Sequence, residues 1–137
     1  AVLLDAAHNP HGARALAAAL ADEFGFRKLV GVVAVLRDKD ARGLFEALEP
    51  ALDEVVVTRN SSPRSRDVDE LAGDAVAVFG ADRVVVEPRL DDAVEQAVSI
   101  TEEVDEDDGA LAGGGVLVTG SVVTAGDART LFGKEPE

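Results

Sequence analysis

Five short apolar runs, each rich in Val and Leu, divide the sequence and predict the strands of a sheet. The runs occupy residues 2–4, 29–36, 55–57, 84–86 and 116–118. Apolar residues are continuous within each run and do not alternate with polar ones, which is typical of strands buried on both faces of a parallel sheet. The runs therefore predict a sheet that lies inside the molecule and is covered by helices.

The stretches between the runs have the spacing of amphipathic helices. Apolar residues recur at intervals of three and four within residues 13–24, 41–52, 68–79 and 90–104, and residues 122–132 are a further helix candidate. Gly25 follows the first stretch where a helix should end, and Asp67 with Glu70 resembles a capping pair before the third. The segment Glu102–Asp108, which contains six acidic residues, is predicted to be a solvated loop before the last strand.

Alternation of strands and helices at this period predicts βαβ units with right-handed crossovers. The predicted fold class is α/β: a three-layer Rossmann-like domain with a mostly parallel sheet of about five or six strands flanked by helices. A length of 137 residues fits one domain with one sizeable core. The five aromatic residues are all Phe, so Val, Leu and Ala must supply most of that core.

The composition excludes several classes of protein. The chain has no Cys, which rules out disulfides and thiolate metal sites. No apolar stretch approaches the roughly 20 residues of a membrane span, and no signal peptide is visible, so we expect a cytoplasmic protein without a membrane partner. The chain also lacks Met and opens inside a predicted strand, which we interpret as a piece of a longer polypeptide.

Acidic residues outnumber basic ones 27 to 13, which gives a net charge of −14. Such a charge argues against nucleic acid as a partner, because phosphate binding requires a basic surface. Two interpretations remain open: an ordinary acidic soluble domain, or a protein from a halophile. At molar salt surface carboxylates repel one another little, so the second interpretation predicts that stability increases with KCl.

Residues with candidate chemistry follow the predicted strands, and ligands of open α/β sheets bind at the carboxyl ends of the strands. They are Asp5, His8 and Asn9 after the first run; Arg37, Asp38, Lys39 and Asp40 after the second; Thr58 to Arg66 after the third; Glu87, Pro88 and Arg89 after the fourth; and Thr119, Gly120 and Ser121 after the fifth. Five of the thirteen basic residues lie in the second and third of these loops: Arg37, Lys39, Arg59, Arg64 and Arg66. A basic cluster on an acidic chain indicates an anionic ligand.

Each candidate also has a purely structural interpretation. Asp5 and Ser121 are residue types that cap helices, and His8 fits a structural histidine. The sequence from Asp38 to Asp40 fits a solvated turn in which Asp40 caps the next helix. Ser121, however, precedes a predicted helix, where anions bind well. His11 is interpreted as a residue at the start of a helix.

Several signatures of catalysis are absent from the sequence. It contains no G-x-x-x-x-G-K-[ST] loop, no G-x-G-x-x-G after the first run and no G-x-S-x-G. No set of His and carboxylate residues has the spacing of metal ligands. We therefore assign no catalytic residue and no metal ligand to this chain.

Four motifs, in this order, carry a family resemblance: LLDAAHNPHGARAL, GVVAVLRDKD, VVVTRNSSPRS and VLVTGSVVTAG. Together they resemble the C-terminal domain of folylpolyglutamate synthase and dihydrofolate synthase, within the Mur ligase superfamily, over nearly the whole chain. Ala6 stands where the family usually has Gly, and Val122-Val123 stand where Leu-Tyr is common.

The resemblance implies part of an ATP-dependent amide ligase. Such an enzyme joins L-glutamate to dihydropteroate or a folylpolyglutamate through an acyl phosphate. The resemblance places the phosphate loop and the Mg²⁺ ligands in an N-terminal ATPase domain that this chain lacks, so the isolated domain, residues 1–137, is expected to be inactive. A haloarchaeal source with a fused dihydropteroate synthase is a further expectation.

Site residues follow from the same resemblance. Asp5 looks like the residue that contacts ATP, and His8 and Ser121 look like those that place the glutamate. Asn9, Lys39 and Arg64 are secondary candidates for anion contacts. Two other functions stay open: a non-catalytic Rossmann-like binding or interaction module, and the equivalent domain of a peptidoglycan-precursor Mur ligase.

Overall fold

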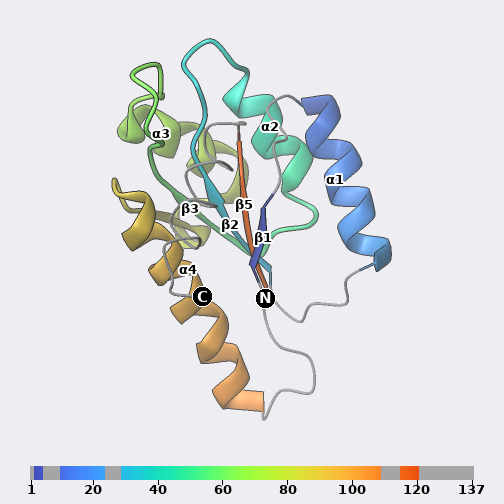
Figure 1. Cartoon of the computed structure of the whole chain (residues 1–137). Helices are drawn as coiled ribbons and strands as arrows, with labels where there is room; N and C mark the ends of the chain where they lie inside the picture. The colour runs from blue at the N-terminus through green and yellow to red at the C-terminus, as the bar shows by residue number, and fades with distance from the viewer. Residues whose placement is uncertain (1, 5–9, 24–28, 109–114, 121–137) are drawn as a thin grey trace, which may run out of the picture.

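The computed structural model describes residues 2–4, 10–23, 29–108 and 115–120, and it places a five-stranded sheet between helices (Figure 1). The strands are β1 (Val2–Leu4), β2 (Leu29–Val33), β3 (Glu54–Val57), β4 (Val84–Val86) and β5 (Gly115–Thr119). The helices are α1 (Pro10–Glu23), α2 (Ala41–Leu48), α3 (Val68–Phe79) and α4 (Leu90–Asp108), with the short 3-10 helix η1 (Ala81–Arg83) before β4. The predicted α/β class is confirmed.

The strand order is β1-β5-β2-β3-β4, and all neighbouring strands are parallel. The last strand, β5, is inserted between β1 and β2, so that Leu117 pairs with Leu3 on one side and with Gly31 on the other. The carboxyl ends of β1, β5, β2 and β3 therefore lie next to one another at one edge of the sheet. This edge is where open α/β sheets bind ligands.

The sheet separates two apolar cores, because successive residues of a strand face opposite sides. On one side α1, α2 and α3 pack against the sheet, and Phe45 meets Phe79 edge to face at a ring-centroid distance of 5.9 Å. On the other side α4 packs Ala93 and Ala97 against Val30. The central strands are thus buried on both faces, as their continuous apolar runs predict.

The edge strand β4 departs from that prediction. Val84 and Val85 are half-buried, and Val86 is 41% exposed. β4 has a neighbouring strand on one side alone, so its apolar run does not indicate complete burial.

Helix α2 is shorter than its apolar spacing predicts. It ends at Leu48 and not near Leu52, because Pro50 has no N–H to continue the helical hydrogen bonds. Leu52 is nevertheless buried and packs against Gly31 of β2. A Cβ added to Gly31 would lie 2.7 Å from the Cδ1 atom of Leu52.

The acidic segment Glu102–Asp108 is helical, and the predicted loop is wrong. It forms the end of α4, which continues from Leu90 to Asp108. The sequence contains neither Gly nor Pro between these residues, and Gly109 is the first helix breaker. The further helix candidate, residues 122–132, lies outside the described residues.

Candidate functional site

The loops that follow β2 and β3 lie side by side at the carboxyl edge of the sheet. Leu36 and Ser65 form an antiparallel bridge between them. The Arg37 N–H donates to the Arg64 carbonyl at 2.8 Å, and the Arg66 N–H donates to the Val35 carbonyl at 2.7 Å. The two motifs R-D-K-D and S-S-P-R-S, which are 20 or more residues apart in sequence, thus form one surface.

Short polar side chains fold the loop after β3. The Asn60 side chain accepts from the Ser62 N–H at 3.0 Å, and the Ser62 hydroxyl accepts from the Arg64 N–H at 3.0 Å. The Ser65 hydroxyl in turn accepts from the Asn60 N–H at 3.2 Å. Such local bonds stabilise tight turns, so the backbone that carries Arg64 is well fixed.

Arg64 forms an ion pair with Asp38 across the two loops. Both side chains are about half exposed, at 56% and 52%. Partial desolvation acts to raise the pKa of Asp38, but the hydrogen bond from its own backbone and the charges of Arg64 and Lys39 outweigh this effect and lower the pKa. An anionic ligand that binds Arg64 would therefore compete with an ionised Asp38.

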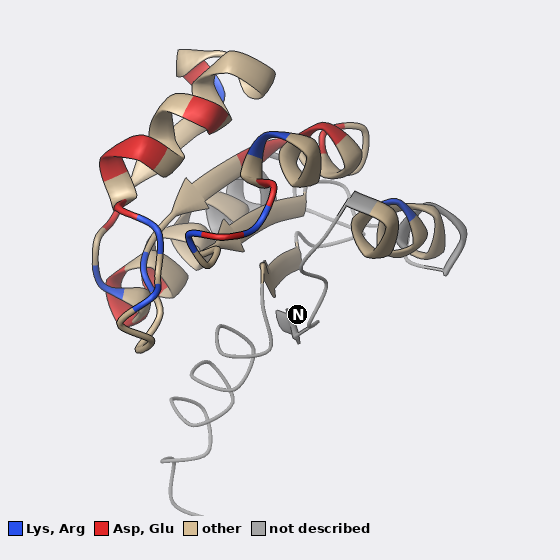
Figure 2. Ribbon diagram, turned by 90° about the horizontal axis from the view of Figure 1, so that it is seen from above, with Lys and Arg blue, Asp and Glu red and all other residues tan. Residues whose placement is uncertain are grey.

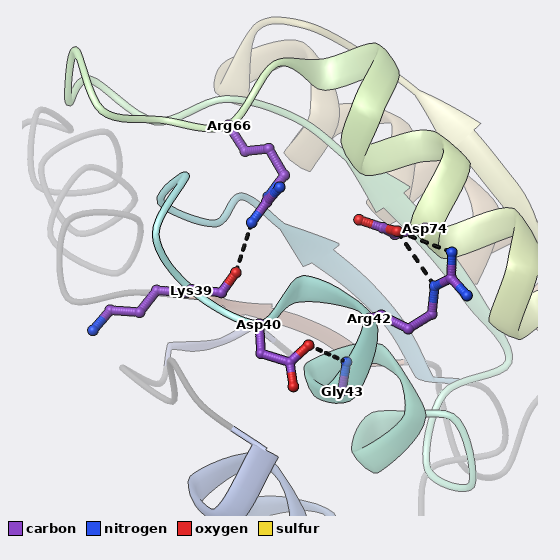
Figure 3. Close-up of polar contacts among 6 residues, drawn as sticks. All are labelled: Lys39, Asp40, Arg42, Gly43, Arg66 and Asp74. Atoms are coloured by element: carbon purple, nitrogen blue, oxygen red, sulfur yellow. Dashed lines mark hydrogen bonds and ion pairs between the residues drawn. The ribbon is translucent and has the colours of Figure 1, made fainter.

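Lys39 and Asp40 have different roles in the same turn. The Asp40 side chain accepts from the Gly43 N–H at 3.0 Å and caps α2, which confirms its structural interpretation. The Lys39 side chain is half-buried, and its ammonium points away from Asp40 and from the neighbouring Arg66 (Figure 3). Lys39 thus offers a cation outward from this turn.

The carboxyl end of β5 approaches the loop after β2 very closely. The Ala34 N–H donates to the Thr119 carbonyl at 3.4 Å. The next residue, Gly120, has a φ of +121°, and a Cβ there would lie 2.2 Å from the Ala34 carbonyl oxygen. Glycine is therefore required at the position directly before Ser121.

Four of the predicted site residues, Asp5, His8, Asn9 and Ser121, lie outside the described residues. Their neighbours are described: β1 ends at Leu4, directly before Asp5, and Leu4 pairs with Val118 of β5. His11 is exposed in the first turn of α1, which agrees with its interpretation as a residue at a helix start.

The five basic residues of the predicted cluster are not equivalent. Lys and Arg gather in the loops after β2 and β3 (Figure 2). Arg64 is paired with Asp38, and the Arg66 side chain donates to backbone carbonyls. Within the described part of the chain, the side chains of Arg37, Lys39 and Arg59 form no ion pair. The cluster therefore combines internal contacts with cations that are available to a ligand.

Two shallow hollows lie elsewhere on the described surface. One, of about 330 Å³, is lined by Glu87, Asp92, Glu95, Gln96 and Ser99. The other, of about 290 Å³, lies between α2 and α3 and is lined by Arg42, Glu46, Glu49, Ala77 and Val78. Among the described residues, no group of three or more His or carboxylate side chains could hold a metal ion, and no helix is long and apolar enough to cross a membrane.

Comparison with known families matches residues 1–122 to the model described as Mur ligase, glutamate ligase domain. A dihydrofolate synthase/folylpolyglutamate synthase of Mycobacterium tuberculosis is 53% identical over 140 residues, which cover 99% of this chain and 29% of that protein. A probable bifunctional folylpolyglutamate synthase/dihydropteroate synthase of Halobacterium salinarum is 36% identical over 94% of this chain and 14% of that protein.

A solved structure gives the same result. The Mycobacterium tuberculosis folylpolyglutamate synthase complexed with ADP superimposes with a TM-score of 0.93 and 54% identity, over 99% of this chain and 30% of that one. The chain thus spans less than a third of the length of these relatives.

Proposed function

Because the chain belongs to the family of Mur ligase glutamate ligase domains, we propose that it is the C-terminal domain of an ATP-dependent amide ligase that adds L-glutamate to dihydropteroate or a folylpolyglutamate. In this reaction ATP phosphorylates a carboxylate of the acceptor and ADP is released. The amine of glutamate then attacks the acyl phosphate, an amide bond forms and phosphate leaves. The 53% identity to a dihydrofolate synthase/folylpolyglutamate synthase over 99% of the chain carries the proposal.

The described geometry fits this chemistry. Acyl phosphate formation and amide synthesis need positioning and charge neutralisation more than a protein nucleophile. The carboxyl edge of the sheet supplies cations on two fixed loops, and both the phosphates of ATP and the carboxylates of glutamate are anions. A domain that closes over the reactants would also exclude water from the acyl phosphate.

The remaining parts of the reaction require a longer polypeptide. We propose that an N-terminal ATPase domain supplies the phosphate loop and the Mg²⁺ ligands, since this sequence contains no G-x-x-x-x-G-K-[ST] pattern. A cytoplasmic location and a fused dihydropteroate synthase domain stay predictions for this chain. The name of the Halobacterium salinarum relative combines folylpolyglutamate synthase with dihydropteroate synthase.

The proposed residue roles follow the strand ends. We propose that Asp5 contacts ATP and that His8 and Ser121 place the incoming glutamate, with Asn9, Lys39 and Arg64 as further anion contacts. The pairing of β1 with β5 supports this assignment, because Asp5 follows β1 directly and Ser121 follows the fixed Gly120. Segments that leave adjacent strands at the same edge begin close together.

The test is kinetic and uses the longer polypeptide. His8→Ala or Ser121→Ala should raise the KM for L-glutamate about tenfold or more, which corresponds to roughly 1.4 kcal/mol of lost binding. His11→Ala is the matched control, because His11 is exposed on α1 and has no proposed role. Normal glutamate kinetics in both variants would show that the residue assignment is wrong.

A substrate comparison tests the branch of the superfamily. Dihydropteroate and folylpolyglutamate should be accepted, and UDP-linked peptidoglycan precursors should not. Turnover of the UDP-linked precursors alone would overturn the proposed reaction and would favour a peptidoglycan-precursor ligase.

A further inference from the structure

Arg66 is bound to the loop after β2 through both its backbone and its side chain (Figure 3). Its Nη2 atom donates to the carbonyl of Arg37 at 2.9 Å and to that of Lys39 at 2.6 Å. Its backbone N–H donates to the Val35 carbonyl at 2.7 Å. Arg64 directs its guanidinium at a carboxylate, whereas Arg66 directs its guanidinium at the main chain.

These bonds restrain the backbone of Lys39 from several directions. The Lys39 N–H donates to the Leu36 carbonyl at 3.1 Å, and the Lys39 carbonyl accepts from the Ala41 N–H at 3.1 Å as well as from Arg66. The next residue, Asp40, caps α2. The turn is thus held between Arg66 and the start of α2, while the Lys39 side chain extends away from both (Figure 3).

We infer that Arg66 is a positioning residue, which fixes the backbone of Arg37–Lys39 so that the Lys39 ammonium meets an anionic group of the reactants. The inference rests on the proposed function, because it requires an anion at this edge of the sheet. The anion is either a carboxylate of the amino acid or a phosphate of the nucleotide. A turn whose backbone is already ordered loses less conformational entropy when the ligand binds. Loss of that order therefore weakens binding.

The test is a double-mutant cycle in the longer polypeptide, with KM measured separately for L-glutamate and for ATP. Lys39→Met should raise one of the two KM values about tenfold, and the affected substrate identifies the anion. Arg66→Met should raise the same KM at least fivefold and change kcat by less than about twofold. Since Arg66 acts through Lys39, the double variant should be no worse than Lys39→Met alone.

Two further variants separate positioning from folding. Arg66→Lys retains a donor for a backbone carbonyl and should recover part of the lost affinity. Arg42→Met is the matched control: Arg42 pairs with Asp74 at 3.2 Å between α2 and α3, and its loss should leave both KM values unchanged. Urea unfolding midpoints are measured for every variant. If Arg66→Met does not fold, Arg66→Lys in the wild-type and Lys39→Met backgrounds replaces it in the cycle.

The outcomes distinguish the inference from the function on which it rests. Three results would overturn the inference and leave the proposed ligase function intact. In the first, the effects of the two substitutions on KM multiply in the double variant. In the second, an Arg66 variant loses stability while both KM values stay unchanged, and in the third, Lys39→Met has normal KM values. A wild-type polypeptide that adds no glutamate would overturn the proposed function itself.

Discussion

Among the glycines of the described ranges, Gly120 is the one whose identity the backbone most strongly requires. Its φ is +121°, and a Cβ there would lie 2.2 Å from the Ala34 carbonyl oxygen. Gly120→Ala should therefore lower the free energy of unfolding by about 2 kcal/mol or more, because it adds backbone strain and a clash with a main-chain atom. Urea denaturation of the chain measures this change.

Gly73 provides the matched control for Gly120. It is exposed in the interior of α3, and a Cβ added there would meet nothing within 4 Å beyond its chain neighbours and the nearby backbone of its own helix. Gly73→Ala should raise the free energy of unfolding by up to about 1 kcal/mol, because Ala favours the helix more than Gly does. A Gly120→Ala variant as stable as Gly73→Ala would contradict the described geometry at β5.

The Asp38–Arg64 pair predicts a pH dependence. Because the pKa of Asp38 is lowered from 3.8 in the folded chain, the stability from this pair is present above that value and is lost as pH falls through the lower folded pKa. Carboxyl NMR titration should place the midpoint of Asp38 below 3.8 in the wild type and higher in Arg64→Ala. An unchanged midpoint in Arg64→Ala would show that the pair does not set the ionisation.

At the scale of single residues, the sequence predicts local contacts better than contacts between residues far apart in the chain. The caps at Asp40 and Asp67 join residues two or three apart, so a short motif is enough to find them. Arg64 and Asp38 are 26 residues apart, and Arg66 reaches a carbonyl 27 residues away. The sequence groups these basic residues in two loops, but it cannot say which of them bind the protein itself.

At the scale of elements, hydrophobic spacing predicts which elements form, and backbone chemistry decides where they end. Pro50 ends α2 before its apolar spacing does, and α4 continues through acidic residues up to Gly109. The position of β5 between β1 and β2 depends on contacts between distant strands. The order of the strands in the sheet cannot be predicted from the spacing of apolar residues, although this spacing predicts the strands themselves.

Arg83 joins three elements and gives the prediction at this scale. It donates to the carbonyls of Leu52 at 2.7 Å and Asp53 at 2.9 Å, pairs with Glu49 at 3.0 Å, and lies 4.9 Å from the ring centre of Phe79. Arg83→Met should lower the free energy of unfolding by about 2 kcal/mol, because it removes several charge-assisted bonds together. Urea unfolding measures the loss.

The control for Arg83 is again Arg42, whose ion pair with Asp74 lies at the surface, with the arginine side chain 53% and the aspartate side chain 25% exposed. Arg42→Met should cost less than about 1 kcal/mol, since exposed pairs contribute little. Equal losses in the two variants would mean that Arg83 acts as an ordinary surface residue and does not link the end of α2 to η1 and α3.

At the scale of the whole molecule, the four strands that begin the motifs end at one edge of the sheet. The strand order places the ends of β1, β5, β2 and β3 next to one another, and two of the motif loops are hydrogen-bonded there. Ligands of open α/β sheets bind at such an edge. We therefore expect the proposed ATPase domain to close against the carboxyl edge and to leave the α4 face open.

The net charge of −14 gives the last prediction, which tests the interpretation as a halophile protein. The relatives do not decide it: the Mycobacterium tuberculosis protein is 53% identical and the Halobacterium salinarum protein 36%. Increasing KCl from about 0.1 M to about 1 M shortens the Debye length from about 10 Å to about 3 Å, so repulsion among surface carboxylates decreases. The Tm measured by circular dichroism should rise by several degrees.

A charge-reduced variant separates screening from general salt effects. Replacing Glu102, Glu103 and Glu106 of α4 by Gln removes three negative charges, which changes the net charge from −14 to −11. If repulsion limits stability, this variant should have a higher Tm at low salt and a smaller rise with KCl, because fewer carboxylates repel one another. A wild-type Tm that stays constant up to molar KCl would show that the acidic residues are an ordinary solvated surface.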